Sequence, residues 1–292
     1  MTPLRQRFID DLRLRNFSPK TVKAYVAGVV RFARHFGRSP AQLGSEEIRS
    51  FQIHLLQQRA TWSLYNQTVC ALRFLYGVTL GRPDVVHTIP YGKKPKTLPS
   101  VLSPEEVVQL IASAKPGRQR VMVQTAYACG LRINELLHLC VTDIDSARMV
   151  VIVRQGKGRK DRLVPLSPRL LAELRGYWRQ YRPATWLFPG LIPGQPLTDG
   201  TFHRWFQELV CRSGFRKRVT CHTLRHSFAT HLLEAGVDLV TLQALLGHSH
   251  LRATVCYLHI STRHLQRMPS LLDLLVIPPS VAASSPATEG QA

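Results

Sequence analysis

The sequence has few acidic residues, no long apolar run and no regular arrangement of cysteines. No stretch approaches the roughly 20 consecutive apolar residues that a membrane-spanning helix needs. The segment MTPLRQRFIDDLRLR at the start is charged throughout and has no apolar signal-peptide region. We therefore expect a cytoplasmic protein with no membrane partner.

The cysteines form no CxxC pair and no framework of spaced pairs, which argues against a disulfide-stabilised domain and against a structural zinc site. We interpret them as reduced thiols, most of them small core residues, and we expect neither a metal nor another cofactor. The six positions are Cys70, Cys129, Cys140, Cys211, Cys221 and Cys256.

The shortage of acidic residues leaves a strongly basic chain. Its 292 residues contain 39 Lys and Arg against 18 Asp and Glu, a net charge of +21. Residues 1–100 carry 16 basic and 5 acidic side chains, and the remainder carries 23 and 13, so the excess extends over the whole chain. Such a field attracts a polyanion, most often nucleic acid. The alternatives are a ribosome-associated protein and a protein that binds anionic membranes.

Residues 1–85 predict an all-α helical bundle that contacts DNA. Ser18 and Pro19 form a helix start, after which apolar side chains recur at helical spacing until Gly37. Two further helices are expected, one beginning at Ser45 and one over about 63–80. Basic side chains on the exposed faces of this bundle are candidate DNA contacts, among them Arg31, Arg34 and Arg73.

Residues 86–103 predict a linker, because prolines, lysines and a glycine occur there without any periodicity. Three of its side chains can follow a phosphate backbone: Lys93, Lys94 and Lys96. A second domain is expected over 104–277, and the Ser-, Ala- and Pro-rich segment 278–292 predicts a disordered tail.

The second domain is expected to be mainly helical with a small antiparallel sheet, an α+β arrangement. A capping box with a first-turn proline, Ser103 to Glu106, opens it, and several helical segments follow. Two β-branched runs flank the turn Gly156–Lys160, which indicates a β-hairpin.

Several separate segments of this domain carry basic, hydrogen-bonding or nucleophilic side chains. Two arginines can bind the non-bridging oxygens of a phosphodiester and stabilise their charge during in-line attack. A tyrosine can supply the nucleophile, and a lysine can give a proton to the leaving oxygen. The candidates are Arg132, Lys157, His222, Arg225, His248 and Tyr257.

Taken singly, each of these signals has a simpler interpretation. A GKGRK turn is typical of a solvated hairpin tip, and a single tyrosine near a C-terminus is typical of surface or core. His222 and His226, four residues apart, also suggest a zinc-binding helix. However, no Glu lies beside the first histidine of HTLRH, and no third ligand is evident.

The segments CGLRINELLHL, GKGRKDRLVPL, HTLRHSFATHLL and LLGHSHLRATVCYLH, in this order, resemble the tyrosine recombinases, also called the phage integrase family. The resemblance covers 104–275 strongly and 1–85 more loosely. It implies that the six candidates above are the catalytic residues and that Glu135 is a supporting acidic residue. It also leaves Arg159 and Lys160 as candidate DNA contacts. Cys221 departs from the proline that many members have before the histidine.

The resemblance further implies a site-specific recombinase or integrase. Tyr257 would attack a phosphate and form a 3′-phosphotyrosyl link, without ATP or metal, in a homotetramer on two double-stranded DNA sites. Such enzymes serve integration, excision or transposition of mobile elements. Three alternatives stay open: a type IB topoisomerase with the same chemistry, a non-catalytic DNA-binding regulator, and a metal-dependent transposase, for which the carboxylates are too few.

Overall fold

The computed structural model describes residues 2–93, 99–154 and 161–258. The chain divides into two compact units between Thr97 and Leu98, inside the segment expected to be a linker. Along the described residues, no helix combines the length and the apolar character that crossing a membrane requires.

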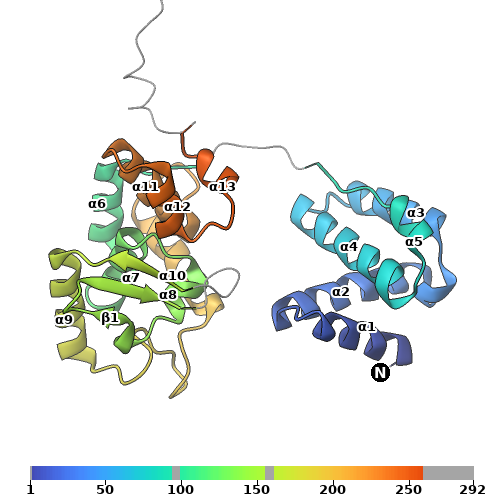
Figure 1. Cartoon of the computed structure of the whole chain (residues 1–292), viewed down its shortest axis with the longest axis horizontal. Coiled ribbons are helices and arrows are strands. Elements are labelled where there is room, and N and C mark those ends of the chain that lie inside the picture. Colours follow the sequence, from blue (N-terminus) through green and yellow to red (C-terminus); the bar gives the residue numbers. More distant parts are fainter. Residues whose placement is uncertain (1, 94–98, 155–160, 259–292) are drawn as a thin grey trace, which may run out of the picture. The chain divides into compact units, whose positions relative to one another are not determined.

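The N-terminal unit is built of helices, as expected (Figure 1). Thr2, Ser18 and Thr61 each cap a helix by accepting a bond from the backbone N–H three residues later. α2 packs along α4, and Phe32 and Leu72 belong to the apolar core of this unit. The helices are α1 (Pro3–Leu14), α2 (Pro19–Phe36), α3 (Ser45–Gln57), α4 (Trp62–Phe74) and α5 (Pro83–His87).

The end of this unit differs from the helix expected over 63–80. α4 stops at Phe74, and a π-helical turn covers Leu75–Thr79. Within this turn Tyr76 is completely buried, and its hydroxyl donates to the carbonyl of Pro40 at 2.8 Å. The turn thus places a buried phenol against the segment between α2 and α3.

Arg73 holds the beginning of the expected linker against the helices. Its Nη1 donates to the carbonyls of Val86 and Ile89, both at 2.7 Å, and its guanidinium lies 4.8 Å from the centre of the Tyr91 ring. Ile89 is buried. Nη1 of Arg73 thus bonds inside the unit, and the interpretation of Arg73 as a DNA contact stays a prediction.

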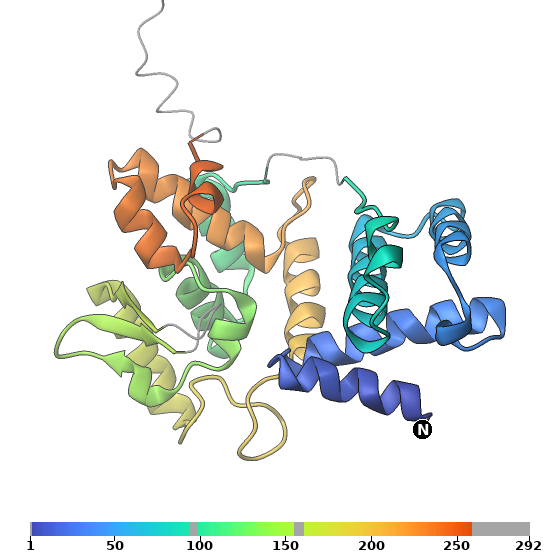
Figure 2. The same ribbon diagram turned by 45° about the vertical axis from the view of Figure 1, so that its right-hand side comes forward.

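The second unit is mainly helical with a small antiparallel sheet, which confirms the expected fold class (Figure 2). Four of its helices begin at a Ser or Thr cap, at Ser103, Ser167, Thr198 and Thr220. The helices of this unit are α6 (Pro104–Ser113), α7 (Arg118–Ala128), α8 (Ile133–Leu137), α9 (Pro168–Tyr181), α10 (Asp199–Arg212), α11 (Cys221–Glu234), α12 (Leu239–Leu246) and α13 (Arg252–Val255).

The sheet has the order β1-β2-β3, with β1 (Ile144–Asp145), β2 (Val150–Val153) and β3 (Arg162–Pro165). β2 and β3 are the two arms of the expected hairpin, and Val151 lies opposite Val164. Both side chains are buried in the core of this unit. The hairpin tip, residues 155–160, lies outside the described residues.

Three helices near the end of the described chain form the setting of the site. α11 packs against α7 and α12, and α12 packs against α13, so segments distant in sequence lie side by side (Figures 1 and 2). A small apolar cluster joins them, with Phe228 from α11, Leu242 and Leu246 from α12, and Tyr257.

Candidate active site

Arg225 lies inside the second unit, with only 3% of its surface exposed. Its Nη1 donates to the carbonyl of Gly130 at 2.7 Å, and its Nη2 donates to the carbonyl of Leu246. Burial and the nearby charge of Arg132 lower its pKa to about 10, so the side chain stays charged at neutral pH. Because a guanidinium has five N–H groups, these bonds leave donors for an anion.

Two glycines bring their backbone close to these arginines. Gly130 and Gly247 have φ values of +56° and +61°, which other residues rarely adopt. A Cβ on Gly130 would lie 2.3 Å from the Phe228 ring, and one on Gly247 would lie 3.0 Å from Cδ of Arg162. The Gly247 carbonyl accepts a bond from Nη2 of Arg132 at 3.3 Å. Both turns therefore depend on glycine.

Arg132 precedes α8 and contacts Glu135 twice. Its backbone N–H donates to Oε2 at 2.9 Å, and its Nη1 donates to Oε1 at 2.7 Å. The helix start and the catalytic candidate are thus fixed by the same carboxylate, which explains why an acidic residue follows Arg132 at this spacing.

Glu135 also binds a residue that the sequence interpretation missed, Arg162 of β3. The Nη1 and Nη2 groups of Arg162 donate to Oε1 and Oε2 at 2.9 and 2.7 Å. Burial alone would raise the pKa of Glu135, but the bonds and charges of Arg162 and Arg132 lower it to about 2. Glu135 is therefore an ionised counter-charge between arginines. The only signal for Arg162 in the sequence was its place directly after the GKGRKD turn.

Tyr257 is almost completely buried, with 2% of its surface exposed. Its ring lies parallel to that of His248, with 6.4 Å between centres and 6° between planes. His248 in turn bonds through Nδ1 to the Thr254 hydroxyl at 3.0 Å. Burial raises the pKa of Tyr257 to about 12, although the charges of Arg225 and Arg132 act in the opposite direction.

The hydroxyl of Tyr257 bonds to His226, the second histidine of HTLRH, across 3.0 Å from Oη to Nδ1. Burial, together with His222 and Arg225, lowers the pKa of His226 to about 4, so the ring is neutral at pH 7. From the sequence, His226 was considered only together with His222, as a zinc-binding pair that the lack of a third ligand argued against.

His222 lies one turn before His226 on α11, with 6.5 Å between the ring centres. It is exposed to solvent at the surface of the helix. Partial desolvation and the charges of Arg225 and Arg132 lower its pKa, which favours the neutral ring.

The structure thus brings together five of the six predicted catalytic residues, Arg132, His222, Arg225, His248 and Tyr257, with the supporting residue Glu135. Lys157 and the candidate contacts Lys94, Lys96, Arg159 and Lys160 lie outside the described residues. In the N-terminal unit, Lys93 and Arg34 are exposed, and Arg31 is half-buried with Nε 3.4 Å from the carbonyl of Ala27.

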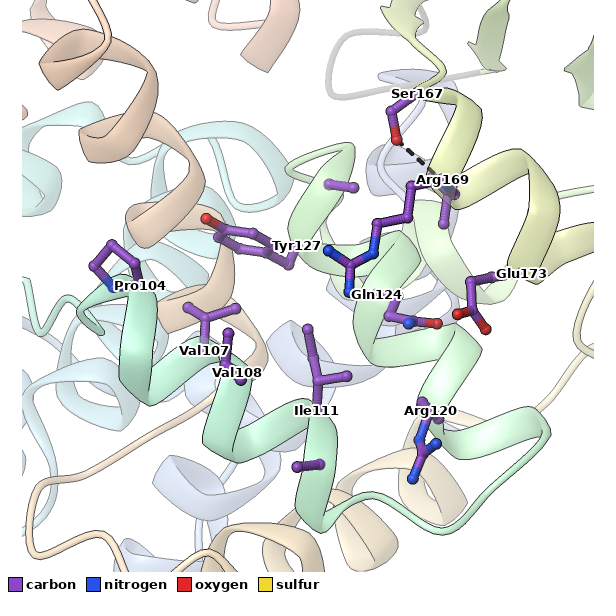
Figure 3. A pocket seen from close by; sticks show the side chains of 13 residues that line it. Pro104, Val107, Val108, Ile111, Arg120, Gln124, Tyr127, Ser167, Arg169 and Glu173 are labelled. Carbon is purple, nitrogen blue, oxygen red and sulfur yellow. Dashed lines mark hydrogen bonds between the residues drawn. The ribbon is translucent and has the colours of Figure 1, made fainter.

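A separate hollow of about 550 Å³ lies between α6, α7 and α9. Figure 3 shows apolar side chains of α6, such as Val107 and Ile111, along one side of it and polar side chains, including Arg120 and Glu173, along the other. None of the catalytic candidates that the structure describes lines it. The hollow is thus separate from the cluster of arginines around Tyr257.

Comparison with protein-family models matches both parts of the chain. Residues 100–264 match the model of the phage integrase family, and residues 4–84 match a phage integrase N-terminal SAM-like domain. The chain belongs to the phage integrase family. The resemblance drawn from its motifs is thereby confirmed.

Curated relatives extend over nearly the whole chain. A putative integrase/recombinase, y4qK of Sinorhizobium fredii, is 46% identical and covers 95% of this chain and 91% of its own length. The tyrosine recombinase XerA of Thermococcus kodakarensis is 34% identical, with coverages of 92% and 95%. Membership makes this chain a tyrosine recombinase, an enzyme of site-specific recombination.

Solved structures share the fold at lower sequence identity. A lambda integrase dimer bound to a COC′ core site gives a TM-score of 0.72 at 18% identity, over 92% of this chain and 97% of that one. A XerH recombinase bound to a palindromic difH substrate gives a TM-score of 0.70 at 21% identity, over 86% of this chain and 80% of that one. These likenesses support the fold described above.

Proposed function

We propose that Tyr257 is the nucleophile with which this recombinase opens a phosphodiester of duplex DNA. The observation that carries the proposal is the position of the Tyr257 phenol in the field of Arg225 and Arg132, both of which favour its ionised form. Two arginines beside a phenol form a site for a phosphate that the phenol can attack.

The proposed step forms a bond from Oη of Tyr257 to phosphorus and breaks the bond from phosphorus to the 5′ oxygen. Arg132 and Arg225 bind the non-bridging oxygens, where negative charge grows in the transition state. Lys157 gives a proton to the leaving 5′ oxygen. The products are a 3′-phosphotyrosyl link and a 5′ hydroxyl, and attack by the 5′ hydroxyl of a partner strand restores the DNA.

The resting site is expected to be inactive. With a pKa of about 12, only about one Tyr257 in 10⁵ is ionised at pH 7. His222 and His248 are the further groups expected to bind the phosphate or help the phenol lose its proton. We propose that bound DNA completes the site before cleavage proceeds.

Both units are proposed to contact the DNA, because both carry an excess of basic residues. Exposed Arg34 and Lys93 are candidate contacts, as are the half-buried Arg31 and Arg73, and Lys94, Lys96, Arg159 and Lys160 are retained from their positions in the sequence. We further propose a cytoplasmic homotetramer on two recombination sites of a mobile element. Support comes from the family and from the DNA-bound recombinases of the same fold.

The recombination site can be found by selection from random DNA. A pool of nicked random-sequence duplexes is incubated with the protein, and duplexes joined covalently to it are isolated and sequenced. Two copies of the captured sequence in one plasmid should then give deletion or inversion, without ATP or metal. Capture by wild type but no exchange between copies would contradict site-specific recombination.

The same plasmid separates this function from its nearest alternative. A type IB topoisomerase uses the same tyrosine chemistry but needs no second site. It would relax a supercoiled plasmid that carries one copy or none, and it would leave two copies unexchanged. A non-catalytic DNA-binding protein would do neither and would capture no duplex.

A further inference from the structure

We propose that His226 is a positioning residue for the nucleophile: its Nδ1 accepts the hydroxyl bond of Tyr257 and holds the phenol beside the two arginines. This inference rests on the proposed role of Tyr257. It goes beyond the six catalytic candidates, because His226 was none of them.

The first support is that His226 is the hydroxyl's only hydrogen-bond partner in the described part of the chain. The Tyr257 side chain is buried, and its ring lies among the apolar residues Phe228, Leu242 and Leu246. A buried hydroxyl without a partner is costly, so the bond to His226 makes this position of the phenol favourable.

The second support is the direction of the bond. The neutral His226 ring has one nitrogen that can accept. If Nδ1 carried the proton and donated, the phenol proton would have no acceptor among the described residues. We therefore assign the phenol as the donor and Nδ1 as the acceptor of this bond.

The third support is the place of His226 on α11. It directly follows Arg225, whose guanidinium is fixed by the carbonyls of Gly130 and Leu246. A residue next to this anchored arginine is itself held in place, so the bond to Tyr257 fixes the nucleophile relative to the phosphate-binding side chain.

The same helix supplies a matched control. His231 bonds through Nδ1 to the hydroxyl of Tyr127 at 2.8 Å, which repeats the chemistry of the His226–Tyr257 pair. Tyr127 lies at the edge of the hollow in Figure 3, and neither member of this pair is among the catalytic candidates. Loss of the control bond should affect stability without affecting the nucleophile.

The experiment compares His226→Asn, His226→Leu and His231→Leu with wild type. Asn can place an amide oxygen near the position of Nδ1, whereas Leu removes the acceptor. Covalent capture is timed on a nicked duplex selected from the random pool, at saturating DNA. Affinity is measured by fluorescence anisotropy on the same duplex without a nick, and folding is checked by urea denaturation.

We expect His226→Leu to form the covalent adduct at least about tenfold more slowly than wild type. Its affinity for DNA should stay within about twofold of the wild-type value. His226→Asn should recover most of the rate, and His231→Leu should match wild type. A wild-type rate for His226→Leu would overturn the inference. So would a His226→Asn variant as slow as His226→Leu, because ring packing and not the hydrogen bond would then matter.

A second readout needs no DNA. With 3-fluorotyrosine incorporated at position 257, the ¹⁹F resonance should shift in His226→Leu and stay near the wild-type value in His226→Asn and His231→Leu. An unchanged resonance in His226→Leu also overturns the inference. If wild type captures no duplex at all, the proposed function fails, while this spectrum still decides whether His226 holds the hydroxyl.

Discussion

Arg162 binds both carboxylate oxygens of Glu135, at 2.9 and 2.7 Å, and donates from Nε to the carbonyl of Leu245 at 2.7 Å. One buried side chain thereby ties β3 to α8 and to α12. Because β3 leaves the hairpin that carries Lys157, this link sets the root of the hairpin against the residues expected to hold the phosphate.

Replacing Arg162 with Met should destabilise the second unit by about 3 kcal/mol, because it leaves Glu135 with a poorly compensated buried charge. Arg162→Lys should lose less stability, since it keeps the positive charge but not the bidentate hydrogen bond to the carboxylate. Urea denaturation measures both. Arg148→Met, which alters an exposed side chain before β2, is the control. Equal losses at Arg162 and Arg148 would show that the link does not matter.

The Glu135 carboxylate should make stability depend on acid. Its pKa of about 2 in the folded chain lies below the ordinary value of 4.5, so its contribution is complete above pH 4.5 and is lost as pH falls toward 2. The loss should be about 1.4 kcal/mol per pH unit in that window, about 3 kcal/mol in all. The advantage of wild type over Glu135→Gln in unfolding free energy should therefore shrink from pH 5 to pH 3. A constant difference would mean that folding does not lower the pKa of Glu135.

DNA affinity should depend steeply on salt, because both parts of the chain are basic. If six or more phosphates are neutralised, the affinity for a duplex should fall about 10³-fold or more between 50 and 200 mM salt. Fluorescence anisotropy over this range gives the slope. A nearly flat slope would contradict binding by both units.

Lys157 should be needed only for a leaving group that requires a proton. Lys157→Ala should cleave ordinary DNA about 10²-fold or more slowly, but should cleave a duplex with sulfur in place of the bridging 5′ oxygen almost normally. Arg132→Ala should stay slow on both substrates, because it stabilises the non-bridging oxygens. Equal impairment of Lys157→Ala on both substrates would show that Lys157 is not the general acid and that its role is electrostatic or structural.

Local signals explain what the sequence predicted well. The starts of helices could be predicted because a Ser or Thr cap and a first-turn proline act within one helical turn, as at Ser18 and Ser103. The hairpin could be predicted from the β-branched residues of its two strands. β1 was missed because two residues, Ile144 and Asp145, leave no periodicity to detect.

The missing parts of the site depend on contacts between distant segments. In the sequence, Arg162 has the pattern of an ordinary strand residue, and only the fold brings Glu135 of α8 to it. His226 likewise has the pattern of a surface or zinc-binding histidine, and only the fold packs Tyr257 against α11. The burial of Tyr257 was equally hidden, because it depends on Phe228, Leu242 and Leu246 from two other helices. The motifs located the catalytic candidates, but only the packing identified their partners.

The most direct test of the central proposal is to identify the amino acid that carries the DNA. Protein captured on the nicked duplex is digested with protease and nuclease, and the peptide that retains a nucleotide is sequenced by mass spectrometry. We predict a 3′-phosphate ester on Tyr257 and no adduct from Tyr257→Phe. A nucleotide on any other residue, or capture of Tyr257→Phe at the wild-type level, would contradict the account.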